Sequence, residues 1–435
     1  MNNKKSIIIA FCVFFCFIFG ISTITLANSK NVSNADLGLN VKSAIAVDPK
    51  THQVLYSKNI NETLPIASIT KLLTVYMVLN EIHSHKLNWN DKVSISKDLQ
   101  SFSLDNTYAN VPLVSGHTYT IKQLYEAALV YSANGAALAL GNKISNNDPN
   151  KLVKMMYFEA KKMGIRNAKF YNACGLKNGE VGSMGIKTAS YDSENVMSAK
   201  DLAILASHLI NQYPEVLNIT KQKSINFNGK KLSNWDLMLN GESQAIPGIK
   251  VDGLKTGTSN AGGANFVGTG VNQGHRIVTV VMHAKNDYTY DPARFIETSK
   301  LMQYVFNNYD FYNFKRGQSA DSLKSVLHND NNFSDYVNVP NGKSMIMPLL
   351  FSENYDIWVP KNNKISGTKL NIASNVKYKN GVNAPIKKFQ PLARMNLNNI
   401  SFLNSDNSQP IMMAANSDDK ANVFVRMWRE ITSWF

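Results

Sequence analysis

A run of apolar residues that follows Ser68-Ile69-Thr70-Lys71 constrains the fold more than any other stretch of this sequence. Residues 72–79 have the length of a helix and carry apolar side chains on nearly every face. Other elements of the same domain must surround such a helix, and Pro65 ends the segment before it. We therefore expect an internal helix whose first turn holds Ser68.

The hydroxyl of Ser68 and the amine of Lys71 are spaced for one face of this helix. Side chains three residues apart have Cβ atoms about 5–6 Å apart, so the amine can accept the hydroxyl proton if it is uncharged. Burial beside another cation lowers the pKa of a lysine below its usual value of about 10.4. The pair is a candidate nucleophile and general base. The same Ser-x-x-Lys pattern also occurs in the polar stretch 94–97, so the motif alone does not establish catalysis.

Residues 1–27 have the pattern of a secretory signal peptide. Lys4 and Lys5 precede an apolar run over residues 7–21, and small residues stand before the expected cleavage point after Ala27. An uncleaved membrane anchor is the alternative interpretation. Either one places the rest of the chain outside the cytoplasm.

Cysteine content and net charge indicate the source of the chain and its location after export. Removal of the signal peptide removes Cys12 and Cys16 and leaves Cys174, so no internal disulfide can form, which favours a bacterial source. The net charge of +15 favours anionic membrane lipid or anionic wall polymer as a partner, and no nucleic-acid-binding motif accompanies it. We expect a protein at the outer face of the bacterial cytoplasmic membrane or in the cell wall, with no nucleic-acid partner.

After a leader at residues 28–39, residues 40–309 begin with strand signals and carry further strand signals before a closing helix. Residues 43–47 and 53–57 predict one hairpin, and residues 266–271 and 276–282 predict a second. Both pairs of runs are joined by short polar turns. Two strand pairs so far apart in the sequence predict a sheet completed by distant parts of the chain.

Helices are predicted between and after these hairpins. Apolar spacing is helical at residues 120–142 and 150–163, and Ser198 with Asp201 predicts an N-cap with an acidic partner. Asp291-Pro292 predicts the start of a closing helix. Its residues expected to cover the sheet are Phe295, Ile296, Leu301, Met302, Tyr304 and Val305. The predicted fold class is α/β (α+β), an antiparallel sheet with an inserted helical subdomain.

The C-terminal quarter of the chain has a different sequence pattern. Residues 310–405 alternate short apolar runs with turns rich in Asn, Gly and Pro, which predicts a small all-β domain. Residues 406–420 are expected to be a linker. Residues 421–435 predict an amphipathic helix that lies in a membrane interface, and a helix packed on its own protein is the alternative. The apolar face of this helix carries Phe424, Met427, Trp428, Ile431, Trp434 and Phe435.

Two further short motifs add candidates for the same chemistry. A serine acylating enzyme needs a second proton carrier, a cation for the negative end of its substrate and N–H donors for the oxyanion. Ser132-Ala133-Asn134 lies in a turn between two helical stretches, and Lys255-Thr256-Gly257 precedes the second hairpin. Ser-x-Asn also occurs elsewhere, for example at residues 145–147, 193–195 and 224–226, and is weak alone. We expect Gly257 to leave room for a substrate against the strand edge.

The three motifs in this order resemble those of the penicillin-recognising serine acyl enzymes. Within that superfamily the chain is similar to the low-molecular-mass penicillin-binding D-alanyl-D-alanine carboxypeptidases. This resemblance covers nearly the whole mature chain and implies a β-lactamase/transpeptidase-like domain followed by a β-rich domain. The segments that carry it, besides the motifs and the terminal helix, are residues 44–71, 170–176, 198–203, 251–257 and 383–388.

The resemblance implies roles for the candidates that acylate the enzyme. Ser68 attacks the carbonyl between two D-alanines of a peptidoglycan stem, Lys71 takes its proton, and water later releases the shortened peptide. Ser132 passes a proton toward the leaving D-alanine, with Lys255 holding the local charge. β-Lactams are covalent inhibitors of such an enzyme, and no metal or organic cofactor is required.

The same resemblance assigns the substrate-binding groups. Asn134 orients the substrate amide, and Thr256 with Lys255 receives the terminal carboxylate. Backbone N–H groups of Ser68 and Thr258 form the oxyanion hole.

The match has departures and leaves alternatives open. Trp235 and Asp236 stand where relatives often carry an arginine that binds the substrate carboxylate. The loops at residues 177–196 and 241–250 are longer than usual. A class A β-lactamase would need a Glu-x-x-x-Asn signature before Lys255, which is missing. A transpeptidase or endopeptidase of the same superfamily, and a catalytically silent wall-binding protein, remain as alternatives.

Overall fold

A computed structural model describes residues 36–287, 291–327, 333–362, 365, 368–403 and 409–432. These residues all belong to one of two compact units of the chain, Val32–Phe435. The expected signal peptide, and Trp434 and Phe435 of the expected terminal helix, lie outside the described residues.

The main sheet has six strands in the order β20-β2-β1-β11-β10-β9, with every neighbouring pair antiparallel. Both predicted hairpins are confirmed, and the second turns at Gln273-Gly274, where φ is positive at both residues. Strands from both ends of the domain meet where β1 pairs with β11, as the separated strand signals predicted. The strand bounds are β1 Ser43–Val47, β2 Gln53–Lys58, β9 Lys250–Ser259, β10 Gly263–Asn272, β11 His275–Ala284 and β20 Ser401–Phe402.

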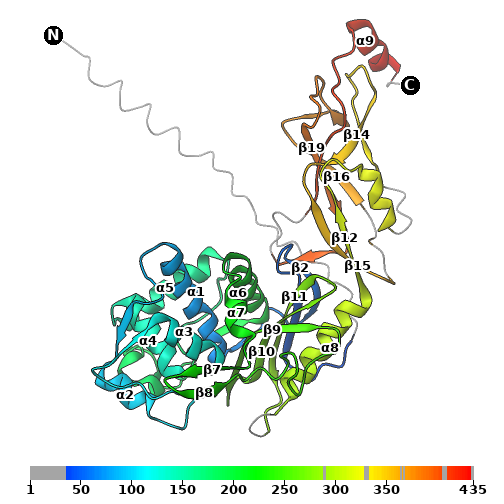
Figure 1. Ribbon diagram of the computed structural model, residues 1–435. Coiled ribbons are helices and arrows are strands. Elements are labelled where there is room, and N and C mark those ends of the chain that lie inside the picture. Colours follow the sequence, from blue (N-terminus) through cyan, green and yellow to red (C-terminus); the bar gives the residue numbers. More distant parts are fainter. Residues whose placement is uncertain are drawn as a thin grey trace, which may run out of the picture. The chain divides into compact units, whose positions relative to one another are not determined.

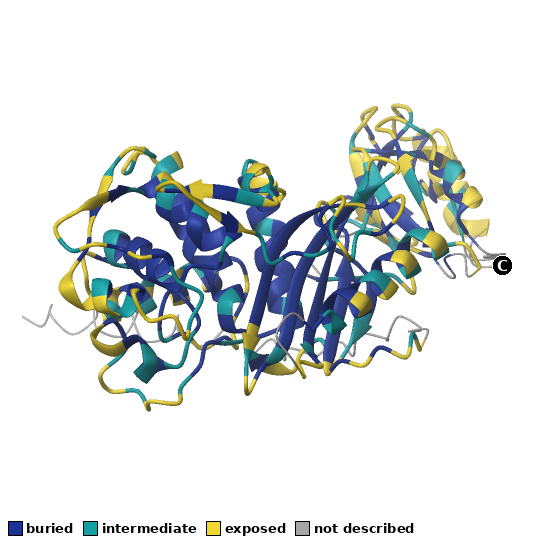
Figure 2. Cartoon of the chain, turned by 60° about the horizontal axis from the view of Figure 1, so that its bottom comes forward, coloured by how far each residue is buried: buried dark blue, intermediate teal, exposed yellow. Residues whose placement is uncertain are grey.

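Helices cover both faces of this sheet (Figure 1). Side chains alternate along β1, so that Ile45 joins the core under α6 (Ala199–Gln212) while Ala44 joins the core under α8 (Ala293–Asn308). Figure 2 shows the resulting sheet as buried along most of its length. The closing helix is confirmed as the cover of the second face, but Ile296 is 43% exposed and points away from the sheet.

The helical subdomain is inserted between β2 and β9. Its apolar helix α1 is buried at every residue from Thr70 to Leu79, which confirms the predicted internal helix. The capping box at Ser198 and Asp201 is also present. The helices of this region, besides α6, are α1 Thr70–His83, α2 Lys97–Ser103, α3 Ile121–Val130, α4 Asn134–Ser145, α5 Pro149–Lys162 and α7 Val216–Thr220.

Short elements join these helices. Two of them are 3₁₀ turns, η1 Ala67–Ile69 and η2 Asn178–Met184. The others form three two-stranded sheets: β3 Thr63–Pro65 with β6 Val196–Ser198, β4 Lys92–Ser94 with β5 Thr118–Thr120, and β7 Ser224–Phe227 with β8 Lys230–Ser233.

The C-terminal region contains a five-stranded sheet in the order β13-β14-β21-β19-β16 and a ribbon formed by β12 and β15. The expectation of a linker at residues 406–420 is wrong for Ile411–Ala414, which forms the central strand β21 between β14 and β19. Its side chains complete the apolar core of this sheet. The other bounds are β12 Tyr309–Phe314, η3 Ala320–Ser325, β13 Tyr336–Asn338, β14 Ile346–Phe351, β15 Tyr355–Pro360, β16 Thr368–Ile372, β17 Lys377–Tyr378, β18 Gly381–Val382 and β19 Pro391–Leu397.

The last described helix, α9, spans Val423–Thr432 and buries none of its residues. Its apolar side chains face solvent, with Phe424 79% and Trp428 68% exposed. Its polar side contacts the C-terminal region, because Arg429 donates to the carbonyl of Gly342 at 2.7 Å and Glu430 pairs with Lys379 at 2.9 Å. In the part of the chain that the structure describes, no helix has the length and apolar character needed to cross a membrane.

Candidate active site

Ser68 lies in the 3₁₀ turn η1, immediately before α1 rather than within its first α-helical turn. It is half-buried, whereas its neighbours Ala67 and Ile69 are fully buried. Ala67 has a left-handed backbone with φ of 47°, which changes the chain direction just before the hydroxyl. The turn is held against β9, so the position of the serine depends on long-range packing.

Gly257 explains how β9 comes so close to this turn. A Cβ atom at Gly257 would lie 2.5 Å from the carbonyl oxygen of Ile66 and 3.1 Å from the backbone nitrogen of Ile69. The expectation that this glycine also leaves room for a substrate stays a prediction, and Gly257 does line the cavity described below. The missing side chain makes room for the turn that carries the nucleophile.

The amine of Lys71 is completely buried and surrounded by three oxygen atoms. Its Nζ lies 2.7 Å from Ser68 Oγ, 2.7 Å from Asn134 Oδ1 and 2.9 Å from the carbonyl oxygen of Cys174. Burial lowers the pKa of Lys71 from 10.5 to about 8. The predicted pairing of the serine and the lysine is present. The lowered pKa allows the amine of Lys71 to act as a base near neutral pH.

The carbonyl of Cys174 is a contact that the sequence did not reveal as functional. The side-chain oxygen of Asn172 accepts hydrogen bonds from the backbone of Cys174 and Gly175 and shapes this loop. Gly175 has φ of 88°, and a Cβ there would collide with the carbonyl of Ala67. The segment 170–176, which carried part of the resemblance, therefore supplies one of the three acceptors of Lys71.

Ser132 and Asn134 occupy the break between α3 and α4. Ser132 is 6% exposed and has φ of 63°, a strained conformation for a residue other than glycine. Asn134 begins α4, and its side-chain amide donates to the carbonyl of Ala109 at 3.2 Å while its oxygen contacts Lys71. The predicted turn thus presents Ser132 to the cavity and ties Asn134 to the base.

Lys255 and Thr256 lie on β9, opposite Val267 and Phe266 of β10. Lys255 is 3% exposed, and its amine donates to the carbonyl of Thr256 at 3.0 Å. Burial is the largest cause that lowers its pKa well below 10.5; the charges of Lys71 and Arg294 lower it further, and Asp236 opposes them. Two buried amines therefore compete for protons in this site.

One cavity of about 490 Å³ joins the three motifs. Its lining includes Ser68, Ser132, Asn134, Thr256, Gly257 and Thr258. Lys71 and Lys255 are buried behind the lining residues. Lys71 contacts Ser68, and Lys255 contacts Thr256. The sequence-predicted residues are thus brought to one place, although they come from η1, the α3–α4 turn and β9.

Arg294 is a cavity residue that sequence reasoning missed. It lies in the first turn of α8, is 8% exposed, and donates to Thr258 Oγ1 at 2.7 Å and to the carbonyl of Gly257 at 3.1 Å. Burial lowers its pKa from 12.5 to about 10, which still leaves it charged at neutral pH. The predicted helix start at Asp291-Pro292 was the only signal near it, and that signal says nothing about what the helix faces.

Trp235 also lines the cavity, whereas its neighbour Asp236 is buried, and the charge of Asp236 opposes the fall in the pKa of Lys255. The indole N–H of Trp235 donates to the carbonyl of Tyr131 at 2.8 Å, directly before Ser132. Neither of these two residues therefore supplies the positive charge that an arginine would bring to the substrate carboxylate. Among the described residues, no group of three or more His, Cys, Asp or Glu side chains could hold a metal ion.

Comparison with known proteins agrees with this geometry. Residues 28–286 match the peptidase S11 family, which is described as D-alanyl-D-alanine carboxypeptidase. The D-alanyl-D-alanine carboxypeptidase DacF of Bacillus subtilis (strain 168) is 26% identical over 364 residues, covering 83% of this chain and 82% of DacF.

Solved structures agree as well. That of a peptidoglycan synthesis regulatory factor (PBP3) from Streptococcus pneumoniae is similar with a TM-score of 0.68 and 29% identity, covering 87% of this chain and 99% of that one. Penicillin-binding protein D2 from Listeria monocytogenes in its cefotaxime-bound form has a TM-score of 0.50 and 31% identity over 61% of this chain and 96% of that one. The predicted fold class is confirmed.

Proposed function

Because the chain belongs to the D-alanyl-D-alanine carboxypeptidase family, we propose that Ser68 is the nucleophile with which this serine-type carboxypeptidase removes the terminal D-alanine of peptidoglycan stems. The observation that carries the proposal is the distance of 2.7 Å between Lys71 Nζ and Ser68 Oγ at the cavity wall. A lysine pKa of about 8 leaves roughly a tenth of the amine uncharged at pH 7. That fraction can accept the hydroxyl proton as Ser68 attacks the peptide carbonyl.

Ser132 is the proposed carrier of the proton to the leaving group. When the C–N bond breaks, the nitrogen of the departing D-alanine needs the proton that Lys71 has taken. Ser132 shares the cavity with Ser68, and its neighbour Asn134 contacts Lys71. A hydroxyl at this place can donate to the amine while it accepts from the lysine, so the base is restored before water attacks the acyl-enzyme.

Thr258 and Arg294 are the proposed partners of the substrate carboxylate, together with Thr256. A guanidinium binds a carboxylate in a planar geometry and stays charged throughout the pH range of the reaction. Arg294 already contacts Thr258 at the end of β9 beyond Thr256. The negative end of a D-Ala-D-Ala substrate would thus lie past the nucleophile, which places the scissile carbonyl near Ser68.

The apolar face of α9 is proposed to bind an anionic membrane surface. Phe424, Met427, Trp428 and Ile431 are all more than half exposed, while Arg429 and Glu430 hold the opposite side of the helix on the protein. Aromatic side chains on a short amphipathic helix are typical of interfacial binding. Together with the signal-peptide pattern, this arrangement supports an exported enzyme at the outer face of the cytoplasmic membrane, where the stems and their β-lactam mimics are accessible.

The test is release of D-alanine from a pentapeptide that ends in D-Ala-D-Ala, measured with the purified full chain in detergent. We expect stoichiometric formation of free D-alanine and the tetrapeptide, and labelling of Ser68 by a fluorescent penicillin. If penicillin labels Ser68 but no D-alanine is released, the transpeptidase alternative is favoured. If neither occurs, the wall-binding alternative is favoured.

A further inference from the structure

Trp235 lines the cavity but takes no part in the proposed transfer of protons. Its indole N–H donates to the carbonyl of Tyr131 at 2.8 Å, and the two rings are tilted with their centroids 6.3 Å apart. That carbonyl belongs to the peptide group that joins Tyr131 to Ser132, the proposed carrier of the proton to the leaving group. Trp235 is therefore linked through one peptide group to a reacting hydroxyl.

Ser132 has a backbone conformation that its residue type rarely adopts. Its φ is 63°, and it directly follows the C-terminal end of α3. Glycine is the usual residue in the left-handed conformation after a helix, because it has no Cβ atom. A serine there is strained and keeps the conformation only where surrounding contacts hold it. A glycine would remove the strain but also the hydroxyl, so the site depends on those contacts.

Hydrogen bonds fix the peptide groups on both sides of Ser132. The group before it is held by Trp235 through the Tyr131 carbonyl. The group after it is held through the N–H of Ala133, which donates to the carbonyl of Ala127 in the last turn of α3 at 3.0 Å. Ala127 belongs to the helix that ends just before Ser132, whereas Trp235 comes 104 residues after Tyr131. Trp235 thus supplies support that the local sequence cannot.

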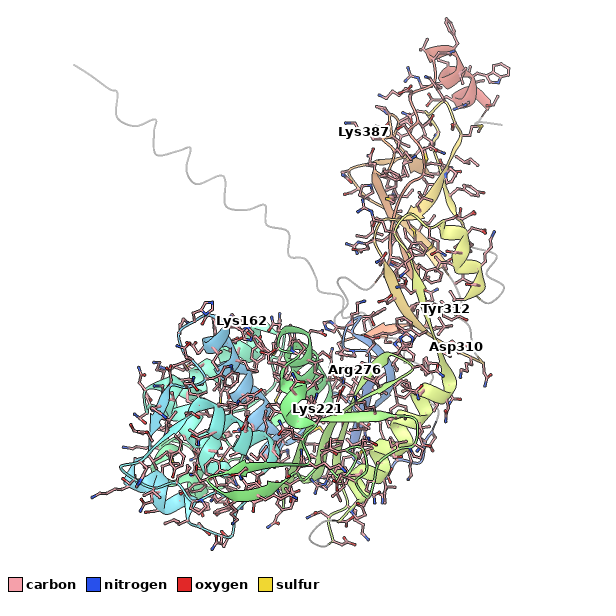
Figure 3. The ribbon with its side chains drawn as sticks, viewed as in Figure 1. Lys162, Lys221, Arg276, Asp310, Tyr312 and Lys387 are labelled. Carbon is pink, nitrogen blue, oxygen red and sulfur yellow. The ribbon has the colours of Figure 1, made fainter. Side chains whose placement is uncertain are left out.

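The segment that carries Trp235 is itself held in place. It follows β8, which packs with β7 against α3. The side chain of Asn234 donates to the carbonyls of Thr220 and Gln222 at 3.0 and 2.8 Å, on either side of Lys221, which is labelled in Figure 3. Because Trp235 directly follows this anchored residue, its indole can keep the neighbouring carbonyl in one position.

We propose that Trp235 is a positioning residue that holds Ser132 in its left-handed conformation and so directs the Ser132 hydroxyl toward the nitrogen of the leaving D-alanine. The inference rests on the role proposed above for Ser132. During acylation, the proton of Ser68 moves to Lys71 as the Oγ–C bond forms and the carbonyl electron pair moves onto oxygen. That electron pair then returns as the C–N bond breaks. At this point Lys71 gives its proton to Ser132, and Ser132 gives its own to the nitrogen.

Delivery of this proton matters more for some leaving groups than for others. The nitrogen of a peptide must be protonated to leave, whereas the oxygen of an ester leaves with little assistance, because an alkoxide is a much weaker base than an amide anion. A depsipeptide that ends in D-Ala-D-lactate presents the same methyl groups and carboxylate as one that ends in D-Ala-D-Ala. Misplacement of the Ser132 hydroxyl should therefore slow the peptide more than the ester.

The test compares Trp235→Phe with Trp235→His in the full chain. Phenylalanine keeps an aromatic ring without an N–H, whereas the Nε2–H of histidine lies as many bonds from the backbone as the indole N–H. The measured quantity is kcat/KM at pH 8 for a pentapeptide that ends in D-Ala-D-Ala and for its D-Ala-D-lactate ester. We expect Trp235→Phe to lower kcat/KM about 10²-fold for the peptide and at most about threefold for the ester. Trp235→His should recover about tenfold of the loss for the peptide.

An indole in another part of the chain serves as the matched control. The N–H of Trp358, on β15, donates to Asp48 at 2.8 Å. Trp358→Phe removes an indole hydrogen bond of the same length, so it should lower the melting temperature without changing the ratio of kcat/KM between the two substrates. Thermal unfolding of each variant checks that it is folded. Trp235→Gln, whose amide N–H also lies as many bonds from the backbone, replaces Trp235→His if that variant is unstable.

Three outcomes would overturn the inference. Equal losses for peptide and ester in Trp235→Phe would mean that the indole only forms part of the cavity wall. An unchanged kcat/KM would mean that Ser132 keeps its conformation without Trp235. A donor variant no more active than Trp235→Phe would mean that the hydrogen bond to Tyr131 is not what matters. Failure of the wild-type chain to release either D-alanine or D-lactate would instead reject the proposed function itself.

Discussion

Lys71 and Trp428 have the opposite burial from what is usual for their residue types, since lysine is usually exposed and tryptophan usually buried. Lys71 is 0% exposed, whereas Trp428 is 68% exposed. In the cavity, three oxygen atoms compensate the buried amine, and the remaining cost of burial appears as a lowered pKa. On α9, no part of the described chain covers the apolar face, so its cost persists until a surface covers it.

This difference separates two kinds of functional region. In the cavity, the buried amine of Lys71 is positioned by contacts with η1, α4 and the 172–176 loop. The polar side of α9 is held by Arg429 and Glu430, whereas no described residue buries its apolar side. Variants in the first region should therefore change chemistry, and variants in the second should change location.

The largest expected effect is that of Ser68→Ala. Loss of the hydroxyl removes the atom that forms the acyl bond, so D-alanine release should fall by at least about 10³-fold. Labelling by penicillin should be lost as well. The melting temperature should stay near that of the wild type, since the side chain is small and half-buried. Retained activity would show that another nucleophile acts.

A smaller loss is expected for Arg294→Gln. The amide keeps much of the size of the side chain but lacks the charge that the proposed carboxylate site needs. We expect kcat/KM for the pentapeptide to fall about 10²-fold. Arg394→Gln, at an exposed position on β19, is the control. Equal activities of the two variants would contradict a carboxylate site at the end of β9.

The lowered pKa of Lys71 predicts the acid limb of the reaction. The neutral amine is the base, so the acylation rate should fall about tenfold for each pH unit below the lysine pKa of about 8. The measurement is the rate of penicillin labelling at single turnover from pH 5.5 to 9. A rate that is constant across this range would mean that the amine does not accept the proton.

The smallest effect is expected on α9, and it concerns binding rather than catalysis. Trp428→Ser should weaken partitioning onto vesicles that contain anionic lipid by about tenfold, while pentapeptide hydrolysis in detergent stays unchanged. Phe158→Ser is the matched control, because Phe158 is a 60% exposed aromatic residue on α5. If both variants bind vesicles as the wild type does, the exposed face of α9 is not a membrane contact.

Local sequence was sufficient for features that neighbouring residues determine. The all-round apolar run after Ser68 requires a surrounded helix, and the polar turns between alternating runs require hairpins, whatever the rest of the chain does. The capping box at Ser198 is likewise formed within one turn. The order of the three motifs indicated the chemistry, because each motif carries its reactive groups within three or four residues.

Only the tertiary structure decided how those groups meet. Arg294 reaches Thr258 because α8 packs across β11 and β10, and Cys174 reaches Lys71 because Asn172 and Gly175 direct a loop beneath η1. The same holds for Gly257, whose neighbour is a turn almost two hundred residues earlier in the chain, and for β21, which completes a sheet from a segment expected to be a linker. Patterns along a sequence reflect interactions between residues that are only a few positions apart. The contacts that set these distances and pKa values depend on which elements pack together, and that is decided by the burial of the whole core.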